Sequence, residues 1–194
     1  MSYYIYINGH PGIGKLTIAK ELQSRLQHAK IYHNHLMIDP IAPIVDRTSP
    51  NYHVIRTSLR RHLLDIIATV EEARPTSWIF TDSRSTSPDG KAAAEDYKNA
   101  AAKRGAPFIP IILHCDLEEN LQRIVHEERC SEQNTKLRDA NVLKSLRTEE
   151  KIYSFGVQQE MHLDITRMEP AEAAEAILVH IGKLGQMEVY HHMQ

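Results

Sequence analysis

Residues 9 to 17 read Gly-His-Pro-Gly-Ile-Gly-Lys-Leu-Thr and directly follow an apolar run. Three glycines in this segment, Gly9, Gly12 and Gly14, allow backbone conformations that other residues resist, so the chain can wrap closely around an anion. The wrapped backbone directs its N–H groups inward, and a following helix adds the positive end of its dipole. Lys15 is spaced to reach the β- and γ-phosphates of a nucleotide, and a hydroxyl to reach Mg²⁺. The segment therefore predicts a phosphate-binding loop.

The strict Walker A form of this pattern has Ser or Thr directly after the lysine, whereas here Leu16 comes first and Thr17 follows. The segment GHPGIGKLTIAKEL resembles the loop of nucleoside monophosphate kinases nearly position for position. The resemblance implies that ATP binds the loop and that Thr17 is a Mg²⁺ ligand. The expected ATP-binding residues are Gly9, Pro11, Gly12, Ile13, Gly14, Lys15, Leu16 and Thr17. The alternative is an ordinary Gly/Pro turn, which does not require strand, loop, lysine, hydroxyl and helix in this order.

Composition indicates an ordinary globular protein with no general attraction for polyanions. Of the 194 residues, 42% are hydrophobic and 25% are charged, and the net charge is −2 with the 12 histidines neutral. This balance argues against nucleic acid or an anionic membrane as a partner. Cys115 and Cys130 form neither a metal-binding pattern nor a disulfide framework. No signal peptide or membrane-spanning run is found, so we expect a cytoplasmic protein; the sequence does not indicate its oligomeric state.

Apolar runs alternate with helical patterns along the chain, which predicts an α/β fold with a parallel sheet and helices on both faces. We expect one domain over residues 1–185, followed by a tail at 186–194 that is frayed or held by a partner. Strands are expected at about 3–8, 30–33, 78–81, 108–114 and 162–165. Helices are expected at about 15–28, 51–73, 91–103, 117–128, 140–153 and 170–184.

Five strands with the phosphate-binding loop after the first resemble the fold of the P-loop kinases. That group includes nucleoside monophosphate kinases, shikimate and gluconate kinases, and chloramphenicol phosphotransferase. The resemblance covers nearly the whole chain, although only the loop is specific. It implies a three-layer P-loop NTPase fold, with a five-stranded parallel sheet in the order 2-3-1-4-5. It also implies a small lid over about residues 123–150.

Ligands of open parallel sheets bind at the carboxyl ends of the strands, so the residues that leave each strand are candidates for chemistry. Asp82 leaves the third expected strand, where the resembling kinases keep a carboxylate that organises Mg²⁺. It could act through a metal-bound water or as general base. Arg84, two residues further on, could hold an anionic group of the acceptor. The alternative is that Asp82 caps the following turn and Arg84 is solvated.

Three polar residues, His33, Asn34 and His35, follow the second expected strand and are candidate acceptor-binding residues. The resembling kinases place an aspartate about here as acceptor-binding residue and base, but this chain has none before Asp39. One of the two histidines could take the proton, since imidazole has a suitable pKa. If the strand continues, at most one of them faces the site. The general base therefore stays open between Asp82 and a histidine, which could equally be structural.

Arg56 and Arg60 are four residues apart and share one face of an expected helix. In the resembling kinases the segment after the second strand covers the acceptor, and its arginines hold charged groups. Both arginines are therefore expected to bind the acceptor. The alternative is a solvated face of an amphipathic helix.

Basic residues between the fourth and fifth expected strands are candidates for the lid. Arg123 and Arg129 are expected to reach the phosphates when the lid closes, with Lys136 and Arg138 as further lid residues. Closure would exclude water and limit hydrolysis of ATP. Acidic residues interleave with the basic ones, which argues against a nucleic-acid-binding stripe. The alternative is a charged surface helix.

The sequence thus predicts a kinase that uses ATP and Mg²⁺ to phosphorylate a small-molecule or nucleotide acceptor. The expected catalytic residues are Lys15, Asp82, Arg123 and Arg129, and the expected metal ligands are Thr17 and Asp82. One alternative is a regulatory P-loop ATPase module, which the missing aspartate after the second strand allows. Another is a kinase for nucleic-acid ends, against which the absence of a basic excess argues. A GTPase is disfavoured because His114-Cys115-Asp116 stands where a guanine-reading segment is expected.

Overall fold

The computed structural model describes residues 2–125, 137 and 139–191 of the chain. Its strands form one parallel sheet of five, in the order β2-β3-β1-β4-β5. The strands are β1 Tyr4–Asn8, β2 Ala29–His33, β3 Ser77–Asp82, β4 Phe108–His114 and β5 Met161–Asp164. The α/β class and the expected strand order are therefore confirmed.

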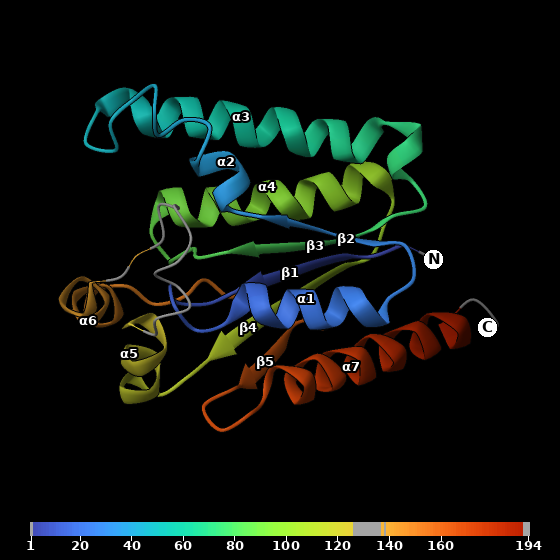
Figure 1. The fold of residues 1–194 in the computed structure, drawn as a ribbon. Coiled ribbons are helices and arrows are strands. Elements are labelled where there is room, and N and C mark those ends of the chain that lie inside the picture. Colours follow the sequence, from blue (N-terminus) through green and yellow to red (C-terminus); the bar gives the residue numbers. More distant parts are fainter. Residues whose placement is uncertain (1, 126–136, 138, 192–194) are drawn as a thin grey trace.

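Helices cover both faces of this sheet and complete three layers (Figure 1). They are α1 Lys15–Arg25, α2 His35–Ile38, α3 Pro50–Thr69, α4 Pro88–Arg104, α5 Leu117–Val125, α6 Ala140–Glu149 and α7 Pro170–His191, with a 3₁₀ helix at Glu71–Ala73. Figure 1 shows α3 and α4 on one face and α1 and α7 on the other. The short helices α5 and α6 lie at the carboxyl ends of the strands, where ligands of such sheets bind.

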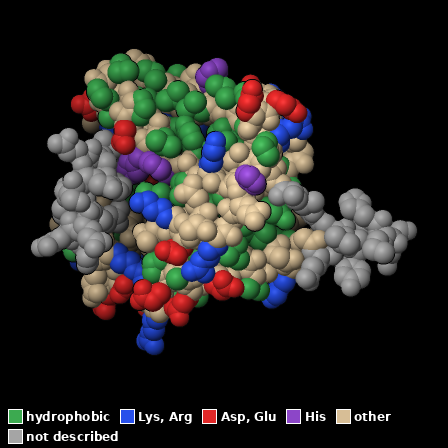
Figure 2. Space-filling view, turned by 45° about the vertical axis from the view of Figure 1, so that its right-hand side comes forward, with side chains coloured by type: hydrophobic (Ala, Val, Ile, Leu, Met, Phe, Trp, Pro, Cys, Tyr) green, Lys and Arg blue, Asp and Glu red, His purple; other side chains and the backbone are tan. Residues whose placement is uncertain are grey.

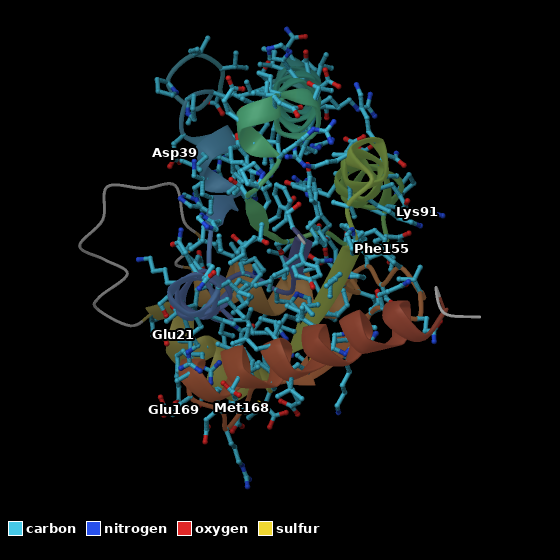
Figure 3. The ribbon with its side chains drawn as sticks, turned by 90° about the vertical axis from the view of Figure 1, so that its right-hand side faces the viewer. Glu21, Asp39, Lys91, Phe155, Met168 and Glu169 are labelled. Atoms are coloured by element: carbon cyan, nitrogen blue, oxygen red, sulfur yellow. The ribbon has the colours of Figure 1, made fainter. Side chains whose placement is uncertain are left out.

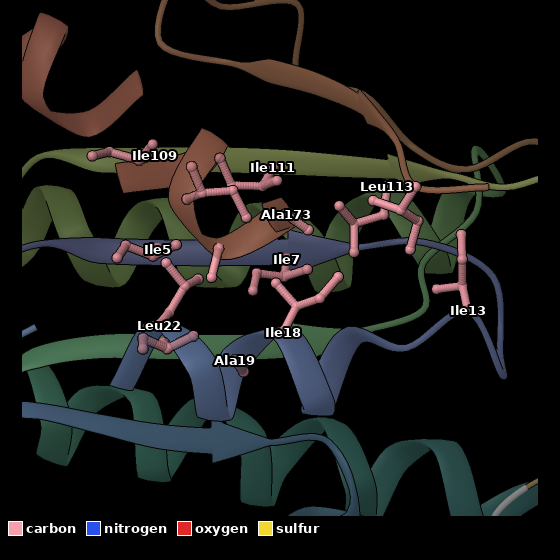
Figure 4. Close-up of a cluster of buried hydrophobic side chains, with 14 of the residues drawn as sticks. Ile5, Ile7, Ile13, Ile18, Ala19, Leu22, Ile109, Ile111, Leu113 and Ala173 are labelled. Atoms are coloured by element: carbon pink, nitrogen blue, oxygen red, sulfur yellow. The ribbon is translucent and has the colours of Figure 1, made fainter. Parts of the chain in front are cut away.

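The central strand β1 is buried along its whole length, so each of its faces packs into a separate core. Ile5 and Ile7 pack with residues of α1 and α7, as Figure 4 shows in close-up. Tyr4 and Tyr6 point the opposite way and pack with residues of α3 and α4. Alternation along the strand thus anchors β1 from both sides and fixes the point where the phosphate-binding loop begins.

Serine-proline pairs start the two helices on the α3–α4 face. The Ser49 hydroxyl accepts a hydrogen bond from the N–H of Asn51, and the Ser87 hydroxyl accepts one from Gly90. A proline follows each serine at the first helical position, where its missing N–H costs nothing. This cap explains why α4 begins three residues before the expected start at 91. Helix α4 ends at Arg104, and Gly105 caps it with a φ of 72°, which suits glycine, as the sequence predicted.

Several helix ends differ from the sequence prediction. Helix α1 ends at Arg25 because Leu26 is extended, and His28 then adopts a positive φ of 55°. Helix α3 ends at Thr69, and a 3₁₀ turn occupies the last part of the expected helix. Helix α7 continues to His191 and so extends into the expected tail at 186–194. Of the helices that the structure describes, none has the length and apolar character needed to cross a membrane.

The outer side of α3 and the segment before it carry exposed apolar side chains, among them Leu36, Ile44 and Val54. Figure 2 shows hydrophobic side chains gathered at the top of the molecule, the side on which α3 lies in Figure 1. Only part of the apolar surface of α3, including Leu64 and Ile67, is buried against the sheet and α4.

Asn8, the last residue of β1, is completely buried, yet its side chain makes four hydrogen bonds. Its Oδ1 accepts from the N–H groups of Gly9 and Arg84, at 3.0 and 2.8 Å. Its Nδ2 donates to the carbonyl groups of Arg84 and Tyr153, at 3.0 and 3.1 Å. One side chain therefore joins the loop after β1, the segment after β3 and the segment that precedes β5.

We expect Asn8→Ala to lower the free energy of unfolding by about 3–5 kcal/mol, because it strands several buried main-chain groups at about 1–3 kcal/mol each. Urea unfolding followed by circular dichroism measures the change. The matched control is Asn99→Ala at an exposed position of α4, where we expect a change within about 0.5 kcal/mol. Equal losses in the two variants would contradict the role given to Asn8.

Candidate functional site

A cavity of about 810 Å³ opens at the carboxyl edge of the sheet. It is lined by residues 11–18 of the loop and α1, by the ends of β2 and β3, and by residues of α5 and of the connection between β5 and α7. Figure 3 shows Asp39 near α2 and Met168 with Glu169 at the start of α7, with α1 between them. The cavity therefore has one side toward β2 and α2 and another toward the β5–α7 connection.

The three glycines of the loop are needed for two different reasons. Gly12 and Gly14 have φ angles of 83° and 109°, in the left-handed region that residues with a Cβ avoid. At Gly9 the reason is space, because a Cβ there would lie 3.1 Å from the carbonyl oxygen of Leu113 on β4. The loop thus has the closely wrapped backbone that the sequence predicted.

Lys15 begins α1 and folds back over the loop. Its Nζ donates hydrogen bonds to the carbonyl groups of Gly9 and His10, both at 2.7 Å. The ammonium group and the N-terminus of α1 are both positive, so the loop is electrostatically suited to a phosphate group. Leu16 and Thr17 also line the cavity, and Thr17 is exposed.

Asp82 lines the cavity at the end of β3 and is only 1% exposed. Its Oδ1 accepts a hydrogen bond from the N–H of Ser83 at 2.8 Å. Its Oδ2 accepts from Arg84 Nε at 2.6 Å and from the Tyr97 hydroxyl at 3.2 Å. Burial alone would raise the pKa of Asp82, but the charges of Arg84 and Arg56 and the hydrogen bonds from Arg84 and Ser83 hold it below its ordinary value. The group is therefore a fixed carboxylate at neutral pH.

Two guanidinium groups stand beside this one carboxylate. The Arg84 side chain is only 11% exposed, which excludes the solvated alternative, and its pairing with Asp82 raises its pKa against the effect of burial. Arg56 Nη2 donates to Asn34 Oδ1 at 2.7 Å, and burial and the charge of Arg84 lower the pKa of Arg56. Arg84 Nη2 and Arg56 Nε are both buried without a hydrogen-bond partner among the described residues.

His33, Asn34 and His35 all line the cavity. The strand ends at His33 and α2 begins at His35, so the alternation of a continuing strand does not apply. The Asn34 N–H still donates to the Thr81 carbonyl at 3.0 Å, which keeps the end of β2 beside the end of β3. The imidazole centroids of the two histidines lie 6.3 Å apart.

Arg56 and Arg84 are not among the residues that line this cavity, although Arg56 contacts Asn34, which does line it. Arg60 does not line it either, in contrast to the acceptor-binding role that its helical spacing from Arg56 suggested. Its Nε and Nη2 donate to Asp96 Oδ2 of α4 at 3.0 and 2.7 Å, and the residue is 3% exposed. Arg61 binds the same carboxylate. Arg60 lies one helical turn beyond Arg56, but Asp96 of α4 binds its guanidinium. Arg60 therefore joins α3 to α4.

Arg123 lines the cavity from α5, but main-chain carbonyl groups hold its guanidinium. Nη1 donates to Ile13 of the loop at 3.1 Å, and Nη2 donates to Ile165 and Thr166 at 2.9 and 3.2 Å. Nε pairs with Glu119 at 2.8 Å. Arg123 therefore links the loop to the β5–α7 connection, a structural role that the expectation of a mobile lid arginine did not include.

Four residues singled out in the sequence, Arg129, Cys130, Lys136 and Arg138, lie outside the described residues. They include three of the basic residues expected in the lid. Cys115 is buried and its thiol is free.

Sequence reasoning missed several residues that shape the site. Asn8 holds the loop to the segment after β3, and Tyr97 holds Asp82. Asn120 of α5 binds the Pro11 carbonyl of the loop, and Arg147 of α6 binds Asn120. One available signal was the spacing of four between Asn120 and the buried Ile124, which puts a polar residue on the inward face of α5.

Comparison with known proteins finds relatives in structure only. No protein-family model matches the sequence, and no curated protein matches it significantly. A gluconokinase from Sinorhizobium meliloti superposes with a TM-score of 0.66, at 12% identity, over 97% of each chain. The chain has the fold of the P-loop kinases. The resemblance predicted from the loop and the strands is thus confirmed at the level of the fold.

Two further structures with the P-loop kinase fold contain ligands. An APS kinase from Mycobacterium tuberculosis, in complex with AMPPNP and APS, has a TM-score of 0.60 and 13% identity over 93% of this chain and 98% of its own. A shikimate kinase from Acinetobacter baumannii, in complex with shikimate, has a TM-score of 0.56 and 17% identity over 94% of both chains. At these identities the shared feature is the fold.

The pKa of His10 is lowered by its burial and by positive charges around the loop. Burial and the charges of Arg147 and Lys15, with His114 as a smaller influence, lower the pKa of His10 from 6.5 to about 4. The unfolded chain therefore binds this proton more readily than the folded protein. Stability is lost as the pH falls from about 6.5 toward 4.

We expect His10→Gln to reduce this acid sensitivity. At about pH 5 the variant should gain about 1 kcal/mol relative to the parent protein, with allowance for the partial exposure of the imidazole. That gain corresponds to about 2–4 °C in Tm and should vanish at about pH 8. Thermal unfolding at both pH values measures it, with His53→Gln on the exposed side of α3 as control. The same pH dependence in both variants and the parent would contradict the assignment.

Proposed function

We propose that the protein is an ATP-dependent phosphotransferase that transfers the γ-phosphoryl group to a small-molecule acceptor. The observation that carries the proposal is the phosphate-binding loop, whose left-handed glycines and Lys15 open onto the same cavity as Asp82. Structural neighbours named as kinases for gluconate, APS and shikimate support it. Most of the work in phosphoryl transfer is positioning and charge neutralisation, which rigid loops and fixed charges supply.

The proposed reaction needs a proton acceptor beside the acceptor hydroxyl. That hydroxyl oxygen attacks the γ-phosphorus, ADP leaves with the electrons of the broken bond, and the hydroxyl proton passes to the enzyme. Asp82 already accepts hydrogen bonds on both oxygens and has a lowered pKa, so we assign it to charge and positioning. His33 or His35, which line the cavity next to it, is then the proton acceptor.

The oxygen atoms of Thr17 and Asp82 fit the cofactor Mg²⁺, which prefers hydroxyl and carboxylate oxygen. Thr17 is exposed in the cavity, and Asp82 Oδ1 has one hydrogen-bond partner among the described residues, so it can accept a second contact. Among these residues, no group of three or more His, Cys, Asp and Glu side chains gathers as a metal site. We therefore propose that Thr17 and Asp82 hold Mg²⁺, which when bound neutralises charge on the phosphates.

The charge balance near Asp82 favours an acceptor with a negatively charged group. The charges of Arg56 and Arg84 both lower the pKa of the buried Asp82. The cluster of these three side chains therefore carries two positive charges and one negative charge. An uncompensated buried charge is costly, as are buried N–H groups without partners. A carboxylate, phosphate or sulfate of the acceptor would supply the missing charge.

Incubation with Mg²⁺-ATP and pooled nucleosides, nucleotides, sugars and small alcohols tests the proposed reaction. We expect release of ADP and a new mass increased by one phosphoryl group, found by mass spectrometry. Lys15→Ala should lose at least about 100-fold of this activity, since Lys15 supplies charge to the transferred group. Binding of ATP without product from any pool would overturn the proposal and favour a regulatory P-loop module.

Arg56→Gln tests the anionic acceptor once a product is known. We expect KM for the acceptor to rise about 10- to 100-fold, since hydrogen bonds to charged groups contribute about 1.5–3 kcal/mol. KM for ATP should change by less than about twofold, because Arg56 contacts Asn34 after β2 and not the phosphate-binding loop. The control is Arg61→Gln, which removes an exposed guanidinium from the same helix. Unchanged acceptor KM in Arg56→Gln would exclude the role.

A further inference from the structure

Helix α5 holds the outward side of the phosphate-binding loop. A loop that turns its N–H groups toward an anion must turn carbonyl groups away, and these need donors of their own. Asn120 Nδ2 donates to the Pro11 carbonyl at 3.0 Å, and Arg123 Nη1 donates to the Ile13 carbonyl at 3.1 Å. Asn120 is completely buried, so its bond to Pro11 is protected from water.

Arg147 determines which end of the Asn120 amide faces the loop. Its Nη1 donates to Asn120 Oδ1 at 2.9 Å, and its Nη2 donates to the Cys115 carbonyl at 2.7 Å. A guanidinium has only donors, so it donates to the oxygen end of the amide and leaves the nitrogen end to donate to Pro11. With the amide reversed, two oxygens would face each other at the loop and two donors at Arg147.

These contacts form a chain from α6 through α5 to the loop. Arg147 lies on α6, Asn120 on α5 and Pro11 in the loop, and Figure 1 shows both helices beside the carboxyl ends of the strands. Arg147 also contributes to the lowered pKa of His10, which places its charge near the loop. The loop conformation therefore depends on residues more than a hundred positions away in the sequence.

We infer that Asn120 and Arg147 are positioning residues for the phosphates of the nucleotide. Arg147 orients the Asn120 amide, and the amide holds the Pro11 carbonyl outward, so that the N–H groups of the loop stay turned toward the phosphates. The inference rests on the proposed nucleotide site, and it assigns a role in nucleotide affinity to two residues that do not line the cavity.

Asn120→Asp separates this role from simple packing. The substitution keeps the shape of the side chain and its contact with Arg147 but places an oxygen against the Pro11 carbonyl. We expect the Kd for Mg²⁺-ADP, measured by isothermal titration calorimetry, to rise at least about tenfold. The Tm without nucleotide should fall by no more than about 4 °C, because the new carboxylate pairs with Arg147.

Substitutions of Arg147 give an independent test if Asn120→Asp does not fold. Arg147→Met removes the donors and should raise the Kd for Mg²⁺-ADP about tenfold, whereas Arg147→Lys keeps one donor and should restore part of the affinity. Lys144→Met, at an exposed position of the same helix, is the control and should bind as the parent protein does.

The outcomes distinguish this inference from the proposed function. A parent protein that does not bind Mg²⁺-ADP would overturn the proposed function and, with it, this inference. A parent that binds, together with unchanged affinity in Asn120→Asp and Arg147→Met, would overturn this inference alone. Equal losses in Arg147→Met, Arg147→Lys and Lys144→Met would also overturn it, because the effect would then not depend on a donor to Asn120.

Discussion

The arrangement of the whole site depends on the buried amide of Asn8. Asn8 and Asp82 are partners in the register of β1 and β3, so the loop and the carboxylate leave the sheet side by side. The amide then fixes the first N–H of the loop and both main-chain groups of Arg84. Arg84 in turn holds Asp82. The Asn8 side chain, with all its hydrogen bonds made, therefore fixes the phosphate-binding loop relative to the carboxylate of Asp82.

Electrostatics divide the site into two regions with different tasks. Around the loop, burial and the positive charges of Arg147 and Lys15 together lower the pKa of His10. Around Asp82 the charge is partly balanced, and hydrogen bonds from Tyr97 and Ser83 keep the carboxylate in place. The first region suits a polyanion such as a nucleotide tail, and the second suits a smaller group of defined orientation.

Local signals were enough to predict the fold class, the strands and the loop, because the continuously buried β1 is an uninterrupted apolar run and the glycines have specific backbone requirements. The strand order came from resemblance and is confirmed. Roles of single polar residues were harder, because their partners lie far away in the sequence. Arg60 shares a helix face with Arg56 but meets Asp96, and Asn120 meets Pro11 across 109 positions. Helical spacing shows which residues share a face but not which partner meets them.

The buried ion pair of Arg60 and Asp96 joins helix α3 to helix α4. Lys103 with Asp65, and Arg104 with the Ile67 carbonyl, join the same two helices further along. Arg56 lies on α3 and Tyr97 lies on α4. Asp96, which fixes α3, and Tyr97, which holds Asp82, are neighbours on α4, so the attachment of α3 and the orientation of the site carboxylate depend on the same turn of one helix.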